Sequence, residues 1–310
     1  MPQNRRGCQE TRHFIFSDAW CASSRCEGTP LSFLRQVVGP RLMEAREKDK
    51  ERMMNKPSMA VKSTKTPCSK RGETRNRDIY FNTSKLGDFE NLYVFYVDIM
   101  GMKTIMYRSF SKSAIFMGKL HCALVEASTR VPDVVVYPVM DGAYVSAKKY
   151  GDICAFITDL YMRLGRVFVE TKNIDECFLI RGSLAYGPII TGSAITCDVS
   201  RTLNDAGEGA YKNHLLFGFP VVLAAKGEEQ SPPFGVYFDI TVRTAKDNKA
   251  AGIWYKWCSD TSLAVAIRDH MKKYYQYARS HNVELMYDIK RLEDHNQKAM
   301  QLWDYEKESE

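Results

Sequence analysis

The stretch "VFYVDIMGMKT" (Val94–Thr104) decides how the surrounding sequence is interpreted. The β-branched and aromatic residues at its start are typical of a buried strand, which we expect over about residues 92–97. The run ends in a carboxylate, Asp98, and Gly101 follows it closely. An acid where the core would otherwise continue indicates that the strand presents this side chain to something outside the core.

A second acid lies in the next apolar run, residues 133–149, which predicts a hairpin with its bend near "MDG" (Met140–Gly142). If this hairpin lies beside the first strand, Asp98 and Asp141 converge at one edge of the sheet. Two carboxylates are typical ligands of a hard cation such as Mg²⁺, whose coordination is often completed by substrate phosphates. The alternative is that each acid only stabilises a turn, as Asp does in many loops.

The residues after Asp98 favour the metal interpretation. The chain passes through Gly101 toward a predicted helix, and the free backbone amides of such a strand-to-helix turn can bind a triphosphate. We therefore predict a site for a nucleotide and its metal ions.

The remaining patterns alternate between strands and helices. Apolar residues at helical spacing predict helices over about 109–128 and 152–171, and a proline predicts a helix beginning near Pro220 after a short strand. We also expect a hairpin over 177–192, a strand over 233–242 and mostly helix over 262–306. Hairpins intermixed with helices predict an α+β fold, in which helices flank a mostly antiparallel sheet.

Composition is typical of a globular intracellular protein. The chain has 310 residues, 45% of them hydrophobic, so it can bury a large core. Its nine cysteines include no CxxC pair and no apolar leader opens the chain, so we expect reduced thiols and a cytoplasmic location. No apolar stretch approaches the roughly 20 residues of a spanning helix, so we expect a soluble protein.

The net charge of +7 is concentrated at the N-terminus. Residues 1–85 contain 18 Lys and Arg against 9 Asp and Glu, which leaves the other 225 residues slightly acidic. Residues 55–78 are polar and aperiodic, which indicates a solvated flexible arm, with contact to nucleic acid or an anionic surface as the alternative. We predict three parts: a basic tract over 1–85, a core domain over 86–245 and a mostly helical extension over 246–310.

Three motifs resemble class III nucleotidyl cyclases. "FYVDIMGMK" is similar to their F-x-D-I-x-G-F-T strand end, and "YPVMDGAYVSA" to their K-x-x-G-D hairpin, with Met140 where glycine is usual. "IRGSLAYGPIITG" resembles R-x-G-I-x-x-G-P-V-x-x-G, with Ser183 replacing a glycine. The order and spacing agree over about residues 92–229. The resemblance implies the fold of a class III cyclase catalytic domain.

Departures from the family pattern concern the base and the transition state. Tyr137 and Leu215 occupy the two positions that recognise a purine in adenylyl cyclases, and neither side chain offers purine-specific hydrogen bonds. Val222 occupies the place of the family's asparagine, and Lys226 the place of the arginine that stabilises transition-state charge. A lysine keeps that charge but loses the planar fork.

This combination most resembles the bacterial pyrimidine cyclases of Pycsar antiphage defence, which make cyclic UMP or cyclic CMP. The resemblance implies a cytoplasmic homodimer with active sites between subunits, a preference for UTP over CTP, and a product that acts on a separate effector. It also implies residue roles: two Mn²⁺ or Mg²⁺ ions at Asp98, Ile99 and Asp141; phosphates at Ile99, Met100, Gly101, Met102 and Arg181; the base at Tyr137 and Leu215; catalysis by Lys226 and Arg181.

Two alternatives stay open at this point. The missing asparagine at Val222 and the hydrophobic Leu215 would suit a degenerate cyclase domain that binds a nucleotide without turning it over. A nucleic-acid-binding module on a similar sheet would need exposed aromatic residues on a basic face, whereas the sequence after residue 85 is slightly acidic.

Overall fold

The computed structural model describes residues 81–245 and 252–303. One sheet organises them, with strand order β2-β3-β1-β4-β5 and with β6 beside β4. Its strands are β1 (Glu90–Ile99), β2 (Val134–Val139), β3 (Gly142–Ala147), β4 (Ile180–Thr191), β5 (Leu216–Phe217) and β6 (Val236–Phe238). All pairs are antiparallel except β4 with β6, so the predicted α+β fold with a mostly antiparallel sheet is confirmed.

Helices occupy most of the remaining described chain. The α-helices are α3 (Met102–Arg108), α4 (Phe110–Arg130), α5 (Tyr150–Glu170), α6 (Arg201–Asp205), α7 (Phe219–Glu228), α8 (Ile240–Arg243), α9 (Thr261–Ser280), α10 (Asn282–Leu285) and α11 (Ile289–Trp303). Short 3₁₀ turns are η1 (Thr83–Lys85), η2 (Ile174–Glu176), η3 (Gly192–Ala194), η4 (Ala206–Gly209) and η5 (Lys212–His214). The helices expected near 109–128 and 152–171 correspond to α4 and α5.

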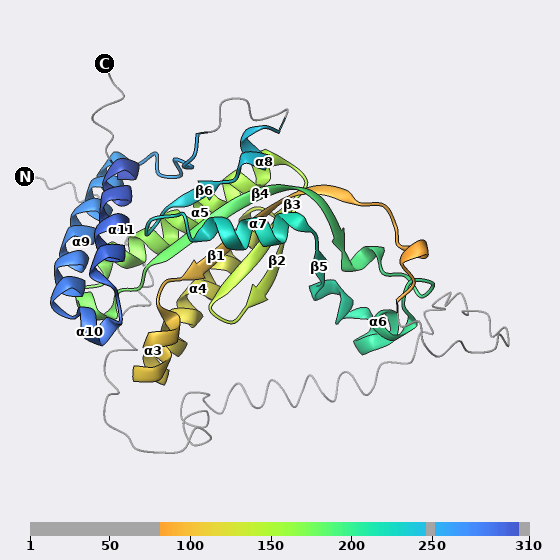
Figure 1. Cartoon of the computed structure of the whole chain (residues 1–310), viewed down its shortest axis with the longest axis horizontal. Helices are drawn as coiled ribbons and strands as arrows, with labels where there is room; N and C mark the ends of the chain where they lie inside the picture. The colour runs from red at the N-terminus through yellow and green to blue at the C-terminus, as the bar shows by residue number, and fades with distance from the viewer. Residues whose placement is uncertain (1–80, 246–251, 304–310) are drawn as a thin grey trace, which may run out of the picture. The chain divides into compact units, whose positions relative to one another are not determined.

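The two faces of the sheet are covered unequally, because side chains of a strand alternate between faces. Odd-numbered residues of β1, such as Phe95 and Val97, belong to a large core shared with α4, α5, α9 and α11. Even-numbered residues, such as Leu92 and Val94, belong to a small second cluster beneath α7. Figure 1 shows α7 on the opposite side of the sheet from α4 and α5. Asp98 is even-numbered and therefore lies on the α7 face.

The C-terminal helices α9 and α11 pack beside α5 and extend the large core (Figure 1). Trp257, just before α9, contacts Tyr161 of α5 and Trp303 of α11, with ring centroids 5.4 and 5.3 Å apart. The segment 262–306, predicted to be mostly helix, contains α9, α10 and α11 in its described part, and α10 ends where Met286 adopts a left-handed conformation with φ of 48°. Residues 304–306 lie outside the described residues.

The hairpin predicted over 177–192 is wrong, since β4 is one continuous strand paired with β1 along its length. Pro188 is tolerated there because the amides of Gly182 and Tyr186 point away from β1, and the strand alternation puts the Pro188 nitrogen on the same open side. Gly187 supplies a φ of 153° that most side chains disfavour. Glycine and proline therefore shape a long strand here instead of turning it.

The remaining predicted strands lie close to their expected positions. The hairpin over 133–149 is confirmed as β2 and β3, and the strand over 233–242 is shortened to β6, after which Asp239 caps α8. No described helix is long and apolar enough to span a bilayer. Every cysteine among the described residues is free of disulfides. Most of the predicted basic tract, residues 1–80, lies outside the described residues, and the domain boundaries stay predictions.

Candidate active site

The two predicted metal-binding acids lie at one edge of the sheet. β1 pairs with β3 so that Asp98 is opposite Gly142, and Asp141 lies in the turn just before β3. The backbone amide of Ile99 donates to the carbonyl of Asp141 over 3.1 Å, which fixes the turn against the strand end. The structure therefore brings Asp98 and Asp141 together, as the motif spacing predicts.

Gly142 allows this close approach. A Cβ atom at residue 142 would lie 2.4 Å from the carbonyl oxygen of Val97 and 3.2 Å from Asp98 Oδ1. Any residue with a Cβ atom at position 142 would collide with the Val97 carbonyl oxygen unless the backbone moved. The glycine of the "MDG" turn thus permits the hairpin to meet Asp98.

Asp98 is poorly stabilised as a bare carboxylate. Burial, and then the negative charges of Asp141 and Glu228, raise its pKa to about 7, although Arg181 and the amide of Ile99 oppose the rise. Its Oδ1 atom is buried and has no hydrogen-bond partner among the described residues. A buried oxygen without a donor and a second carboxylate nearby are the conditions that a bound cation would relieve.

The oxygen atoms at this edge could supply some, but not all, of the ligands of a divalent cation. Since Ile99 donates its amide toward Asp141, the strand alternation also turns its carbonyl to that side, which gives two carboxylates and one carbonyl. No group of three or more His, Cys, Asp or Glu side chains gathers as a metal centre in residues 81–245 and 252–303. Mg²⁺ and Mn²⁺ sites of this kind take their remaining oxygens from water and substrate phosphates.

The predicted phosphate-binding loop is only partly available. The amides of Ile99 and Met100 donate to the carbonyls of Asp141 and Leu179, over 3.1 and 2.9 Å, so they are not free for phosphate as predicted. The Met102 side chain is buried in the core. Gly101 turns the chain with a φ of 73°, and α3 after it has only seven residues. The loop positions Asp98, but it offers fewer free backbone amides for phosphate than the sequence predicts.

Arg181 lies opposite Asp98 on β4, on the same face of the sheet. It is 7% exposed, and its Nε donates to the carboxylate of Glu228 at the end of α7 in a buried ion pair. Burial raises the pKa of Glu228, whereas the charge of Arg181 lowers it. Arg181 Nη1 is buried without a hydrogen-bond partner among the described residues. The ion pair therefore orients a guanidinium that still has one unused donor.

The predicted base-facing residues lie at a different place on the α7 face. Tyr137 of β2 lines a cavity of about 600 Å³, together with Ser146 of β3, Gly192 and Asn213. Burial raises the pKa of Tyr137, and a hydrogen bond with Ser146 opposes this rise. The Leu215 carbonyl accepts from the amide of Gly192, a residue of the cavity wall, over 3.1 Å, but Leu215 itself does not line the cavity.

Lys226 is exposed on α7 and points away from its own sheet. Phe219 and Val222 precede it at helical spacing and are 67% and 45% exposed, so the three form one outward stripe. Pro220, Ala224 and Gly227 form the buried side of the same helix. One protomer thus does not bring Lys226, Tyr137 and Leu215 together with the two aspartates.

Sequence reasoning missed two contributors to the site. Glu228 continues the buried face of α7 after Ala224, and an acid at such a position is a detectable sign of a buried partner. Arg291 of α11 lines a second cavity that also includes Asp98 and Arg181. No local pattern signals this, because helix–helix packing brings α11 to the sheet edge.

No protein-family model and no curated protein matches the sequence. Solved structures with similarity include the dimeric guanylyl cyclase domain of the RhoGC fusion protein from the aquatic fungus Blastocladiella emersonii (19% identity, TM-score 0.39, 51% of this chain and 83% of that chain). The guanylate cyclase domain of RhGC from Catenaria anguillulae, in complex with GTP, is 18% identical (TM-score 0.39, 51% and 82%). An adenylate/guanylate cyclase/hydrolase from Silicibacter pomeroyi is 13% identical (TM-score 0.38, 54% and 85%).

Proposed function

We propose that this protein is a pyrimidine nucleotide cyclase that converts UTP to 3′,5′-cyclic UMP and pyrophosphate. The observation that carries the proposal is the approach of Asp98 and Asp141 at one sheet edge, within motifs that resemble those of class III cyclases. CTP is the second candidate substrate. We further propose that the product is an antiphage second messenger that acts on a separate effector protein.

In this reaction the ribose 3′ oxygen bonds to the α-phosphorus, its proton is released, and the bond from the α-phosphorus to the bridging oxygen of pyrophosphate breaks. Two divalent cations, when bound, would neutralise phosphate charge and lower the pKa of the attacking hydroxyl. Asp98 and Asp141 would hold them, with the carbonyl of Ile99. The contribution of the chain is to position the triphosphate and to supply positive charge from Arg181 and Lys226.

A homodimer with shared sites is the arrangement that we favour. Lys226 and its neighbours on α7 point outward, and the exposed Phe219 and Val222 beside them would be covered by a second copy. In such a dimer, Tyr137, Leu215 and Lys226 of one protomer would face the aspartates of the other.

A mixing experiment tests the shared site. Asp141→Asn and Lys226→Ala should each be inactive, and a heterodimer of the two contains one interface with both halves intact. After subunit exchange we expect roughly a quarter of wild-type activity, because half of the dimers are mixed and each has one complete site. An inactive but verified heterodimer would show that each site is built within one chain.

Pyrimidine preference is proposed from Tyr137 and Leu215. Tyr137 is held by Ser146 in the cavity wall, where its ring takes up space that the second ring of a purine would need. Its hydroxyl both donates and accepts hydrogen bonds, so it accommodates uracil or cytosine. The choice of UTP over CTP is taken from the resemblance to the pyrimidine cyclases.

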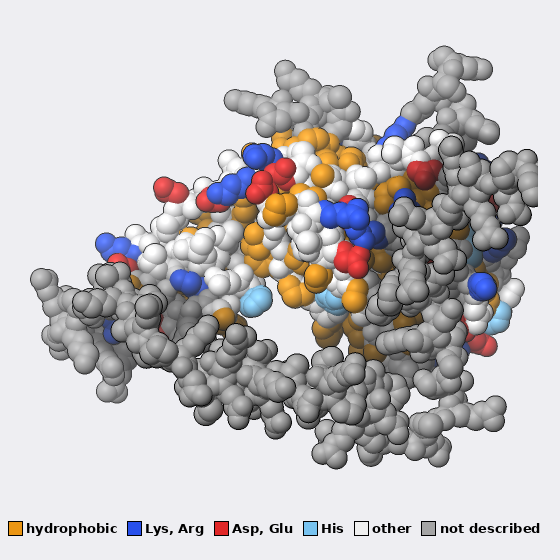
Figure 2. Space-filling model, turned by 180° about the vertical axis from the view of Figure 1, so that it is seen from behind, with side chains coloured by type: hydrophobic (Ala, Val, Ile, Leu, Met, Phe, Trp, Pro, Cys, Tyr) orange, Lys and Arg blue, Asp and Glu red, His pale blue; other side chains and the backbone are white. Residues whose placement is uncertain are grey.

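A degenerate domain that only binds nucleotide is the principal alternative. Two observations favour it: Val222 stands in place of asparagine, and the backbone amides of Ile99 and Met100 already donate hydrogen bonds within the protein. A nucleic-acid-binding surface has less support: on the face in Figure 2, basic side chains of the described residues lie next to acidic and hydrophobic ones and do not gather into a stripe. Arg130 of α4 also pairs with Asp159 of α5 over 2.9 Å.

The decisive experiment is incubation of the purified protein with each of the four ribonucleoside triphosphates and Mn²⁺, followed by product identification. We expect cyclic UMP above cyclic CMP, with little cyclic AMP or GMP. Efficient purine cyclisation would overturn the pyrimidine assignment, and binding without any cyclic product would favour the degenerate domain.

A further inference from the structure

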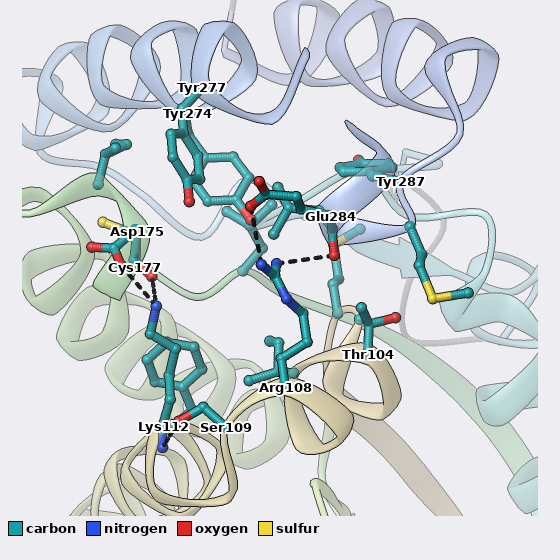
Figure 3. A pocket seen from close by; sticks show the side chains of 18 of the residues that line it. Thr104, Arg108, Ser109, Lys112, Asp175, Cys177, Tyr274, Tyr277, Glu284 and Tyr287 are labelled. Carbon is teal, nitrogen blue, oxygen red and sulfur yellow. Dashed lines mark hydrogen bonds and ion pairs between the residues drawn. The ribbon is translucent and has the colours of Figure 1, made fainter. Parts of the chain in front are cut away.

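A cavity of about 560 Å³ extends from Asp98 to the C-terminal helices. Its walls come from α3, from the start of β4, from α9 and from the segment that joins α10 to α11. Figure 3 shows Tyr274 and Tyr277 of α9 on one wall, with Arg108 of α3 pointing across toward Glu284. Because α11 also lines it, the cavity joins the catalytic edge to a part of the chain that the cyclase motifs do not include.

The basic side chains at the outer end are already neutralised. Arg108 pairs with the carboxylate of Glu284 over 3.0 Å and donates to its carbonyl over 2.9 Å. Lys112 pairs with Asp175 over 3.0 Å (Figure 3). An anionic ligand would have to break these pairs, so the outer end is not its preferred position.

The inner end differs, because two guanidinium groups retain unused donors there. Arg181 Nη1 is buried without a partner, whereas Arg291 is exposed and belongs to no ion pair among the described residues. Tyr287 lines the same cavity as the two arginines, and its hydroxyl oxygen lies 2.6 Å from His295 Nδ1. Burial, and then the charges of Arg181 and Arg291, lower the pKa of His295 to about 4.

We infer that Arg181 and Arg291 together bind the terminal phosphates of the nucleoside triphosphate, so that helix α11 forms part of the substrate site. The inference rests on the proposed cyclase function and deepens it. Arginine presents paired donors that match phosphate oxygens, and Asp98 at the same end lies where the α-phosphate must meet the metal ions. Arg291 is therefore a substrate-binding residue, which also holds the pyrophosphate until it leaves.

The test measures binding of inorganic tripolyphosphate by calorimetry, with and without Mg²⁺, and separately the kinetics with UTP and CTP. Arg291→Ala should weaken tripolyphosphate binding by about tenfold to a hundredfold, since hydrogen bonds to charged groups contribute about 1.5–3 kcal/mol. It should raise KM by a similar factor and change kcat less. Arg291→Lys should recover part of the affinity by restoring the charge.

Lys290→Ala is the matched control, because Lys290 is the neighbouring exposed base on α11 and does not line the cavity. It should leave binding and KM within about twofold of wild type, as expected of a surface charge. An unchanged thermal midpoint of both variants would show that α11 remains packed, and Arg291→Gln replaces Arg291→Ala if that variant unfolds.

The outcomes separate this inference from the cyclase assignment. Wild-type affinity in Arg291→Ala, or no tripolyphosphate binding by the wild type, would overturn the inference even if cyclic nucleotide is made. Binding that depends on Arg291 but yields no cyclic product would overturn the proposed activity and leave the phosphate site standing.

Discussion

The two ends of the cavity beside Asp98 each contain an arginine–glutamate ion pair, and the two pairs differ in how far their side chains are exposed to solvent. At the outer end, Arg108 and Glu284 form an ion pair whose side chains are 46% and 56% exposed. At the inner end, Arg181 and Glu228 form an ion pair whose side chains are 9% and 6% exposed, and Asp98 has a buried oxygen without a donor. Water satisfies the first set of charges, whereas only a ligand or another side chain can satisfy the second.

This difference shows how much burial, rather than charge alone, determines what an ion pair contributes. An exposed pair gains little, because water screens it and two long side chains lose freedom. A buried pair has lost its hydration, so removal of either partner leaves an uncompensated charge. Breaking each end in turn should therefore give very different effects.

The largest effect should come from the acids at the inner end. Asp98→Asn and Asp141→Asn should each lower cyclase activity on the order of 10³-fold or more, because neither amide replaces a carboxylate as a cation ligand. Asp98→Asn should also stabilise the metal-free protein by about 1–3 kcal/mol, since it removes a partly buried negative charge close to those of Asp141 and Glu228. Activity assays and urea unfolding measure the two effects.

Asp269→Asn on the exposed side of α9 is the control, and both activity and stability should stay close to wild type. Near-normal turnover by Asp98→Asn or Asp141→Asn would show that these acids do not hold catalytic metal ions.

The next largest effect concerns stability. Arg181→Met should lower the free energy of unfolding by about 3–5 kcal/mol, because it leaves Glu228 buried without its cation. Replacing both residues with Met should recover much of the loss. A single variant as stable as the wild type in urea would mean that Glu228 finds another partner or reaches water.

This loss should depend on pH in a defined direction. Burial raises the pKa of Glu228 in the folded state, so folded protein takes up this proton more readily than unfolded protein does. The protonated form of Glu228 therefore stabilises the folded state at low pH, and this stabilisation is lost as pH rises through the folded-state pKa of Glu228. The deficit of Arg181→Met should therefore be smaller near pH 5 than near pH 8, as unfolding curves at both pH values would show.

The smallest effect should come from the outer end. Glu284→Gln should change the free energy of unfolding by about 1 kcal/mol or less, and the change should fall further in high salt. Urea unfolding at low and high ionic strength measures it. A loss comparable with that of Arg181→Met would mean that the Arg108–Glu284 pair holds α10 in place and that the two ends are alike.

Local patterns in the sequence predict much of the fold and part of the site. The helical spacing of Ile153, Phe156 and Leu160 predicts α5, because these residues need only be on one face of a continuous helix. The acid at the end of β1 and the "MDG" bend likewise lie in short segments whose conformation depends on adjacent residues. The hairpin over 177–192 shows the limit of this reasoning, since glycine and proline favour a turn locally and pairing with β1 overrides them.

The sequence by itself determined the α+β class, the position of Asp98 at a strand end and the position of Asp141 in a hairpin bend. Only the tertiary structure decided that Arg181 pairs with Glu228, 47 residues away, and that Arg108 pairs with Glu284, 176 residues away. It also decided that α11 brings Arg291 to the cavity lined by Asp98 and Arg181. The physical reason is that a local pattern specifies which face of an element is buried, whereas the packing of whole elements selects the partner that face meets.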